Sequence, residues 1–432
     1  MIKHYIHKIK NSQLSKDILY VFLGQIAIML SVFGINKIVS YYMGVESFAV
    51  YNLIKRAGGL LACVVSGGLT IALPRYLARH TSSSTFDRAI ASSLTEASIL
   101  IVSIYGLIVT AVCFLFPSQF NYIFFQSNEI NYSLILVVVV FALGQTYSNL
   151  LFSYYQGIGN FKKYNIAQFI CSSLCLFFAY IFRSNLYTFV LTSYLTLLII
   201  GLCPMLYLKG RNSKKVTSDN RIKRINTIVR SKLLKYGTPR LLHDLMLFAQ
   251  DVIPLIIILH RFDIHIVGLY SAGLSIPLTI SPLFAFTGGV FLQRVSLLVK
   301  QNDWKAINKM INIALIIFTA IAIVGTLILI LTKEFIVTLM FSSEFNEVIP
   351  LVPYFALSLL PRAIYLLYRN PLDAVSERPY NLYITTLRTA LLILFLFWGK
   401  STIDCAKAYL YSSIVMAILP LIIWNKLKKN EV

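Results

Sequence analysis

Long apolar runs make up most of this 432-residue chain, and short polar segments separate them. Each run has about 20 residues or more, which is the length that a helix needs to cross the hydrocarbon core of a bilayer. Lipid offers no hydrogen-bond partners to an open backbone, so each run is predicted to be a helix. The twelve runs are 18–43, 49–73, 90–116, 132–156, 164–183, 186–208, 236–259, 266–293, 307–332, 347–369, 379–398 and 403–424.

The composition agrees with this pattern. Hydrophobic residues make up 57% of the chain and charged residues 13%, whereas a soluble domain has roughly 25% charged residues. Twelve spans of about 20 residues use roughly 240 residues and leave room only for short loops and tails. The sequence therefore predicts an all-α integral membrane protein with about twelve transmembrane helices.

Positive charge is distributed unevenly between the connections. Lys and Arg outnumber Asp and Glu by 39 to 17. The two tails and the even-numbered connections hold or border 28 basic residues, and the odd-numbered connections hold four. Cytoplasmic loops collect Lys and Arg, so we predict an even number of spans with both termini in the cytoplasm. Topology and an anionic substrate account for the excess of positive charge, and we expect no nucleic-acid partner.

The most basic connection divides the spans into two sets of six. We expect an N-terminal six-helix bundle over 1–208, a basic cytoplasmic linker over 209–235, and a C-terminal six-helix bundle over 236–432. Transporters often contain internal repeats of this size.

Similar residues recur at equivalent places in the two halves. Tyr51 and Tyr270 are 219 positions apart, and Arg75 and Arg294 are separated by the same 219 positions. Six is an even number of spans, so two such units face the same way. We predict two pseudo-symmetric bundles that are related by an axis along the membrane normal, with a cleft between them.

Several basic side chains fall inside the predicted spans, where an ionisable group costs at least about 2.5–3.5 kcal/mol at mid-depth. Such residues usually face the interior of a bundle and mark a pathway. Guanidinium groups suit carboxylate and phosphate oxygens, so a cationic cleft predicts an anionic substrate. Lys37 lies within two turns of a helix end, where snorkelling to the interface is an alternative explanation. The candidate substrate-binding residues are Lys37, Lys55, Arg56, Arg362 and Arg388.

Two acidic residues lie in the seventh predicted span. Arg240, Asp244 and Asp251 fall on one helical face, and Arg240 and Asp244 can neutralise one another. No Lys or Arg stands one turn away from Asp251 along the sequence. We name Asp251 and Asp244 as candidates for ion coupling. A structural hydrogen bond to a neighbouring helix is the alternative for Asp251.

The sequence contains no motif for a cofactor or a metal. The six cysteines form no C-x-x-C pair, and all lie within the apolar runs, with Cys405 at the start of the last one, which predicts buried thiols. No G-x-x-x-x-G-K-[ST] segment is present. A transporter that lacks this motif takes its energy from an ion gradient or from consumption of its product. We expect no catalytic residue, no cofactor and no bound metal.

Three segments resemble the multidrug/oligosaccharidyl-lipid/polysaccharide (MOP) exporter superfamily. They are GVESFAVYNLIKRAGGLLACVVSGGLTIALPRYLAR (44–79), YYQGIGNFKKYNIAQ (154–168) and AQDVIPLIIILHRFDIHIVGLYSAG (249–273). The first is similar to the second span of that superfamily, which begins with a motif like G-x-x-x-F/Y-G-x-Y. Ala49 stands where this motif has its second glycine. The aromatic content and the basic interior look most like the O-antigen (Wzx-type) flippases of bacterial inner membranes.

The resemblance implies a MATE-like exporter fold, a flippase activity and no enzyme activity. Such a flippase moves an undecaprenyl-pyrophosphate-linked oligosaccharide from the cytoplasmic to the periplasmic leaflet of the inner membrane by alternating access. The implied partners are this anionic lipid-linked oligosaccharide and membrane lipids, with the polysaccharide polymerase machinery as a further candidate. Asp251 falls where many relatives have an Asp on the seventh span.

Other functions fit parts of the sequence. A multidrug antiporter of the same fold would need acidic residues in the cleft, and this chain has few in its spans. A membrane-embedded polysaccharide polymerase or ligase would need a sizeable periplasmic loop, whereas the longest predicted ones, 117–131 and 333–346, are short. A peptidoglycan-precursor flippase of the same superfamily would be expected to carry further helices.

Overall fold

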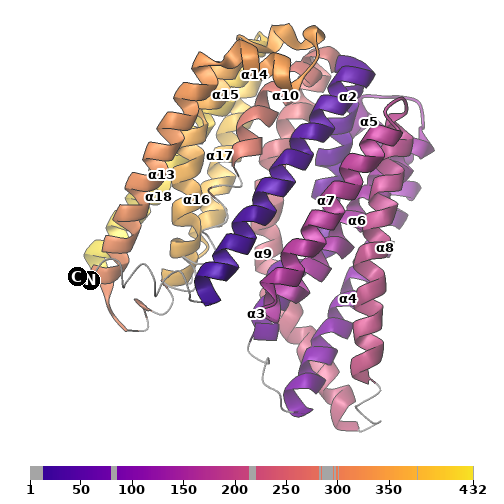
Figure 1. Ribbon diagram of the computed structural model, residues 1–432, viewed down its shortest axis with the longest axis vertical. Helices are drawn as coiled ribbons and strands as arrows, with labels where there is room; N and C mark the ends of the chain where they lie inside the picture. Colours follow the sequence, from indigo (N-terminus) through magenta and orange to yellow (C-terminus); the bar gives the residue numbers. More distant parts are fainter. Residues whose placement is uncertain are drawn as a thin grey trace. The chain divides into compact units, whose positions relative to one another are not determined.

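The computed structural model describes residues 13–78, 85–213, 220–281, 284, 295, 298–299, 301–376 and 378–431. Within these ranges every regular element is a helix (Figure 1). Nine of the described helices are long and apolar enough to cross a membrane. The predicted all-α, multi-pass membrane protein is thereby confirmed.

The helices follow the apolar runs of the sequence closely. They are α2 (Gln13–Ser66), α3 (Leu69–Ala78), α4 (Thr85–Leu115), α5 (Pro117–Phe125), α6 (Tyr132–Gly157), α7 (Phe161–Ile181), α8 (Leu186–Ser213), α9 (Asn220–Arg261), α10 (Ile264–Ile280), α13 (Trp304–Leu331), α14 (Lys333–Met340), the 3-10 helix η1 (Ser343–Val348), α15 (Val352–Leu357), α16 (Leu359–Val375), α17 (Tyr380–Trp398) and α18 (Thr402–Glu431).

Asn and Asp side chains cap the starts of several of these helices. Each side-chain oxygen accepts a hydrogen bond from a backbone N–H of the first turn, which has no partner within the helix. The N···O distances are 2.8–3.1 Å. The caps are Asn131 for α6, Asn160 for α7, Asp263 for α10 and Asp303 for α13.

Helix α2 contains more than one predicted span. Its apolar part, Gly24–Ser66, has 43 residues, and a straight helix of that length would be roughly twice as long as the hydrocarbon core is thick. The helix is interrupted at Gly44, where φ is 79° and ψ is −178°. Glycine adopts this backbone without the strain that a side chain would add. The interruption falls between the predicted spans 18–43 and 49–73.

Two predicted spans differ in detail from the structure. The run 347–369 is divided between η1, α15 and α16, with a break at Ser358. Pro361 has no N–H with which to bond the carbonyl of Leu357, so a continuous helix is disfavoured there. Helix α10 accounts for the first part of the run 266–293, and most of its remainder lies outside the described residues.

The chain forms two compact units. One takes its residues from Met1–Ser31 and Leu53–Phe248, and the other from Val32–Asn52 and Ala249–Val432. Helices α2 and α9 each contribute residues to both units. The predicted division of the chain at the basic linker 209–235 stays a prediction.

Each unit is a set of packed helices. In the first unit α6 packs against α3, α4, α7 and α8. In the second, α18 packs against α16 and α17, and α16 packs against α13 (Figure 1). The polar groups described below are held at such helix contacts within single units.

Glycines allow α6 and α8 to approach closely. A Cβ atom at Gly144 would lie 2.2 Å from the carbonyl oxygen of Tyr194, and a Cβ at Gly201 would lie 2.4 Å from the carbonyl carbon of Tyr147. Small residues are typical of helix contacts in membranes, where close backbone approach replaces the hydrophobic driving force. Helix α6 is also the most buried of the nine candidate spans. In its most apolar stretch of 18 residues, 78% of the residues are buried.

Candidate functional site

Arg388 lies at the centre of a polar cluster in the second unit. Its side chain on α17 is only 2% exposed. Nη2 donates a hydrogen bond to Ser413 Oγ on α18 at 3.0 Å, and Nη1 donates to Gln250 Oε1 on α9. The guanidinium carbon lies 4.9 Å from the centre of the Tyr409 ring, which is a cation–π contact. Three helices therefore position one buried cation.

The third nitrogen of the Arg388 guanidinium, Nε, has no hydrogen bond with the residues that the structure describes. This nitrogen is buried. A guanidinium carries five N–H donors in a fixed plane, and leaving a buried donor unsatisfied costs about 1–3 kcal/mol. An anionic oxygen beside Nε would remove this cost.

Arg362 joins the same cluster from α16. Its Nε donates to Ser281 Oγ at 2.8 Å, and its Nη1 donates to the Tyr409 hydroxyl at 3.4 Å. Tyr409 thus contacts Arg388 with its ring and Arg362 with its hydroxyl. The structure brings together two basic residues that are 26 positions apart in the sequence and that were both predicted to bind substrate.

Asp251 lies close enough to Arg362 for electrostatic attraction. It is half-buried on α9, next to the Gln250 that holds Arg388. Along its own helix Asp251 has no basic residue one turn away, and the basic neighbour is supplied by α16 instead. The predicted ion-coupling residue and a predicted substrate-binding residue are therefore neighbours in this cluster.

Two buried tyrosine hydroxyls complete the cluster. Tyr270 on α10 and Tyr365 on α16 are 0% and 1% exposed, and neither hydroxyl forms a hydrogen bond with the described residues. Both interact electrostatically with Arg388. Buried polar groups are nearly always hydrogen-bonded, and unsatisfied ones gather where a ligand or ordered water binds.

Lys37 is placed elsewhere in the second unit. Its Nζ donates to the carbonyl oxygens of Thr338 and Phe341, at 2.9 and 2.7 Å. These carbonyls stand at the C-terminal end of α14, where helix carbonyls have no partner within the helix. Lys37 therefore stabilises a helix end in this structure, and its predicted role in substrate binding stays a prediction.

Lys55 and Arg56 belong to the first unit. Both are half-buried on α2, and both interact with neighbouring groups. The cluster around Arg388 is formed by residues of the second unit alone. The predicted role of Lys55 and Arg56 in substrate binding stays a prediction.

Asp244 and Asp251 contribute to different units, although they share α9. Asp244 is half-buried in the first unit and interacts electrostatically with Cys63 on α2. The side chain of Arg240, its proposed partner, lies outside the described residues. The ion-coupling role of Asp244 stays a prediction.

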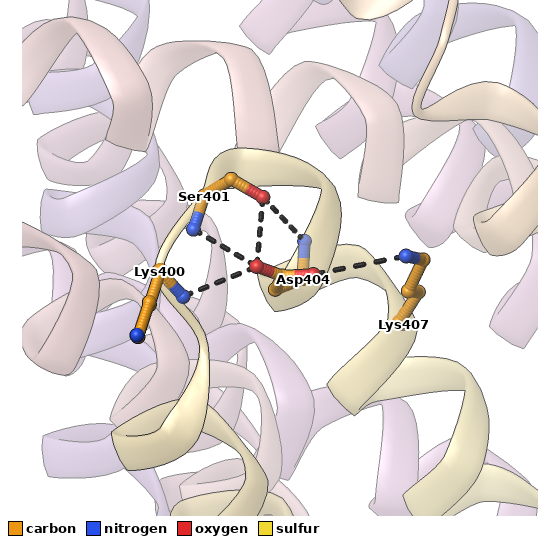
Figure 2. Close-up of polar contacts among 4 residues, drawn as sticks. All are labelled: Lys400, Ser401, Asp404 and Lys407. Carbon is orange, nitrogen blue, oxygen red and sulfur yellow. Dashed lines mark hydrogen bonds and ion pairs between the residues drawn. The ribbon is translucent and has the colours of Figure 1, made fainter.

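Lys407, another basic residue in a predicted span, lies at a helix start (Figure 2). Its Nζ is 3.7 Å from Asp404 Oδ1 and 5.8 Å from the centre of the Tyr354 ring. Asp404 Oδ2 also accepts hydrogen bonds from the backbone of Lys400 and Ser401 at 3.1 Å. These contacts fix the first turn of α18 and explain Lys407 without a substrate.

Among the described residues, no group of three His, Cys, Asp or Glu side chains lies close enough together to hold a metal ion. The cluster around Arg388 is made of guanidinium, hydroxyl and amide groups with one carboxylate. Groups of this kind bind anionic oxygens by hydrogen bonds and charge.

Comparison with solved structures identifies the fold. An inward-facing multidrug resistance MATE family transporter of the MOP superfamily aligns with a TM-score of 0.72 and 12% identity, over 95% of this chain and 99% of that one. The chain has the MATE transporter fold. This confirms the predicted MATE-like exporter fold.

Two further structures with the MATE fold give similar values. A Vibrio cholerae MATE transporter aligns with a TM-score of 0.71 and 14% identity, over 97% of this chain and 98% of that one. A MOP superfamily transporter from Pyrococcus furiosus Vc1 aligns with a TM-score of 0.70 and 14% identity, over 96% and 95% of the two chains. No protein-family model matches the sequence, and no curated protein does so.

The neutral members of the cluster were not predicted from the sequence. Gln250, Tyr409 and Ser413 hold the two arginines, yet uncharged polar residues are frequent in the apolar runs of this chain. One signal was available, because Tyr409 and Ser413 are i, i+4 neighbours on one face of an apolar helix. Whether these two side chains contact the arginines depends on which helices pack together, and the sequence alone does not show which helices do so.

Proposed function

We propose that this protein is a flippase for an anionic lipid-linked oligosaccharide. Its substrate would be an undecaprenyl-pyrophosphate-linked repeat unit, such as an O-antigen unit, carried from the cytoplasmic to the periplasmic leaflet. The MATE transporter fold supports transport by alternating access, in which helix bundles rearrange around a bound substrate.

One observation carries the proposal: a buried guanidinium with an unsatisfied donor, next to a second guanidinium. Arg388 is buried in the low-dielectric interior, and its Nε has no protein acceptor among the described residues. Arg362 shares Tyr409 with it. A pyrophosphate offers several charged oxygens, and paired guanidiniums bind such groups with charge-assisted hydrogen bonds.

Asp251 links substrate binding at this site to its own protonation. Arg362 can pair with the Asp251 carboxylate or with a pyrophosphate oxygen, so the two anions compete for one cation. Protonation of Asp251 removes the competitor and favours substrate binding. Binding of substrate and of a proton are therefore linked, and each strengthens the other.

The proposal includes a location and partners. The excess of Lys and Arg in the even-numbered connections supports an inner-membrane protein with both termini in the cytoplasm. The partners would be the lipid-linked oligosaccharide, the surrounding lipids and the polysaccharide polymerase machinery that uses the product. No catalytic step is needed for this function.

A multidrug antiporter is the second candidate. The solved MATE transporters include multidrug resistance proteins, and the carboxylates of Asp244 and Asp251 are groups that could attract an organic cation. However, the Pyrococcus furiosus MOP transporter is described as having a binding pocket of reverse polarity that suggests a different function. Two arginines beside Asp251 favour an anion over a cation here.

Deletion of the gene distinguishes these functions. Loss of surface polysaccharide in viable cells, restored by the intact gene, is the expected result. Unchanged polysaccharide together with increased sensitivity to cationic drugs would indicate the antiporter. Lysis of the deletion strain would indicate a peptidoglycan-precursor flippase.

A further inference from the structure

The first unit contains a polar cavity of about 200 Å³. Its lining residues come from α3, α6 and α7, near the connection between α6 and α7. Its volume equals that of roughly seven water molecules in the liquid and is below the ~300–1,000 Å³ of drug-sized sites. Its walls are formed by Thr70, Asn149, Phe152, Ser153, Gln156, Tyr164 and Gln168.

None of these seven lining residues carries a charge at neutral pH. Three are amides, three bear hydroxyl groups and one is a phenylalanine. An anionic group would need guanidinium or ammonium partners, and a cation would need carboxylates. Amides and hydroxyls both donate and accept hydrogen bonds, which suits a neutral ligand rich in hydroxyl groups.

The hydrogen bonds within the wall leave specific groups available. Gln168 Nε2 donates to the Tyr164 hydroxyl at 3.0 Å, so that hydroxyl keeps its own proton for another acceptor. Gln168 Oε1 is buried and accepts no hydrogen bond from any described residue. Ser153 Oγ donates to the Thr70 carbonyl at 3.0 Å and keeps its lone pairs. A buried amide oxygen of this kind requires a donor from a ligand or from water.

The same wall offers aromatic surface. The rings of Phe152 and Tyr164 meet edge to face, with their centres 6.2 Å apart. Aromatic faces and edges pack against the apolar C–H faces of ring-shaped ligands, while neighbouring amides bond the hydroxyls at the ring edge. A sugar ring has both kinds of surface.

We propose that this cavity of the first unit binds one sugar ring of the lipid-linked oligosaccharide. The inference rests on the proposed function and adds a glycan subsite to it. The connection between α6 and α7 carries Lys162 and Lys163 and belongs to the proposed cytoplasmic side. The subsite is therefore on the side from which the substrate is loaded.

Binding of purified full-length protein to two lipids tests this subsite. The first lipid is undecaprenyl pyrophosphate, and the second is a panel of the same lipid carrying oligosaccharides of several sugar rings, so that a ring distant from the pyrophosphate is available to the pocket. We expect at least one sugar-bearing lipid to bind about 3- to 10-fold more tightly than the bare lipid. This increase in affinity is what one or two additional hydrogen bonds contribute. Gln168→Leu and Asn149→Leu should remove this difference without weakening binding of the bare lipid.

Phe169→Leu is the matched control, because Phe169 is adjacent to Gln168 and its side chain is 54% exposed. It should keep the sugar preference. If the wild-type protein binds bare and sugar-bearing lipids equally, or if Gln168→Leu keeps the preference, the cavity is a water-filled packing feature and the glycan subsite is wrong. Tight binding of the bare lipid in that case leaves the proposed function intact, and failure to bind either lipid overturns both.

Discussion

The Nη1 of Arg362 donates to the hydroxyl of Tyr409 at 3.4 Å, and the ring of the same tyrosine lies 4.9 Å from the Arg388 guanidinium. One side chain thus holds two cations from different helices. The ring offers a negative face to Arg388, and the hydroxyl offers a lone pair to Arg362. This arrangement allows two guanidiniums to stay close in a protein interior, where like charges otherwise repel.

Tyr409→Phe separates the two contacts of Tyr409. The ring and its cation–π contact with Arg388 remain, and the hydrogen bond from Arg362 is lost. We expect binding of undecaprenyl pyrophosphate to weaken about 3- to 10-fold, as for the loss of one hydrogen bond that positions a charged group. Tyr409→Leu removes both contacts and should weaken it further. Equal binding by all three proteins, measured by titration in detergent, would show that Tyr409 does not position the arginines.

Replacement of the buried cation tests the anionic substrate directly. Arg388→Lys keeps the charge but cannot hold Gln250 and Ser413 together, and Arg388→Ala removes the charge as well. We expect surface polysaccharide to fall with both variants, and with Arg56→Ala, while protein levels in the membrane stay unchanged. Lipid binding should fall about 10-fold or more with Arg388→Lys, because charge-assisted hydrogen bonds are lost.

Lys400→Gln is the matched control for this series. Lys400 is exposed near the start of α18, outside the cluster, and only its backbone N–H contacts Asp404 (Figure 2). Surface polysaccharide should remain at the wild-type level with Lys400→Gln. Full activity of both Arg56→Ala and Arg388→Ala would exclude a cationic site for the substrate.

The helices and the charged members of the site could be predicted from the sequence, and the reason is the cost of placing polar groups in lipid. Uninterrupted apolar runs have few alternatives to a helix, and an arginine such as Arg388 stands out against them. The break at Gly44 was also visible as a short polar interval between two runs. These features depend only on which residues are neighbours along the chain, so they can be predicted from the sequence.

The partners of the charged residues could not be predicted, because they depend on contacts between helices. Asp244 and Asp251 share one helical face, yet α9 contributes them to different compact units. Lys37 was a candidate for substrate binding, and its contacts with Thr338 and Phe341 come from residues about 300 positions away. No periodicity in the sequence links such distant segments.

Lys37→Met should reduce stability more than it reduces binding. Loss of the ammonium removes its hydrogen bonds to the carbonyls of Thr338 and Phe341, and each such bond contributes about 0.5–1.5 kcal/mol. We expect a lower midpoint of thermal unfolding in detergent and unchanged affinity of the folded protein for undecaprenyl pyrophosphate. Lys305→Met is the control, because Lys305 is exposed in the same unit and should leave the midpoint unchanged. A loss of affinity without a loss of stability would assign Lys37 to the substrate instead.

The pH dependence of substrate binding tests whether Asp251 competes with the pyrophosphate for Arg362. The Asp251 carboxylate competes with the pyrophosphate for Arg362, so protonation of Asp251 should strengthen substrate binding. Affinity for undecaprenyl pyrophosphate is therefore expected to be higher when the Asp251 carboxylate carries a proton. The amide of Asp251→Asn has no charge at any pH, so this variant should bind more tightly than the wild type and lose the part of the pH dependence that Asp251 contributes.

Transport should respond to Asp251→Asn in the opposite direction to binding. A variant that holds the substrate tightly and cannot exchange a proton should move less lipid-linked sugar in proteoliposomes, and an imposed pH gradient should no longer change the rate. Asp303→Asn is the matched control, because asparagine caps a helix start as well as aspartate does. If wild-type transport ignores the pH gradient while Asp251→Asn still alters affinity, Asp251 tunes the binding site and another energy source drives the cycle.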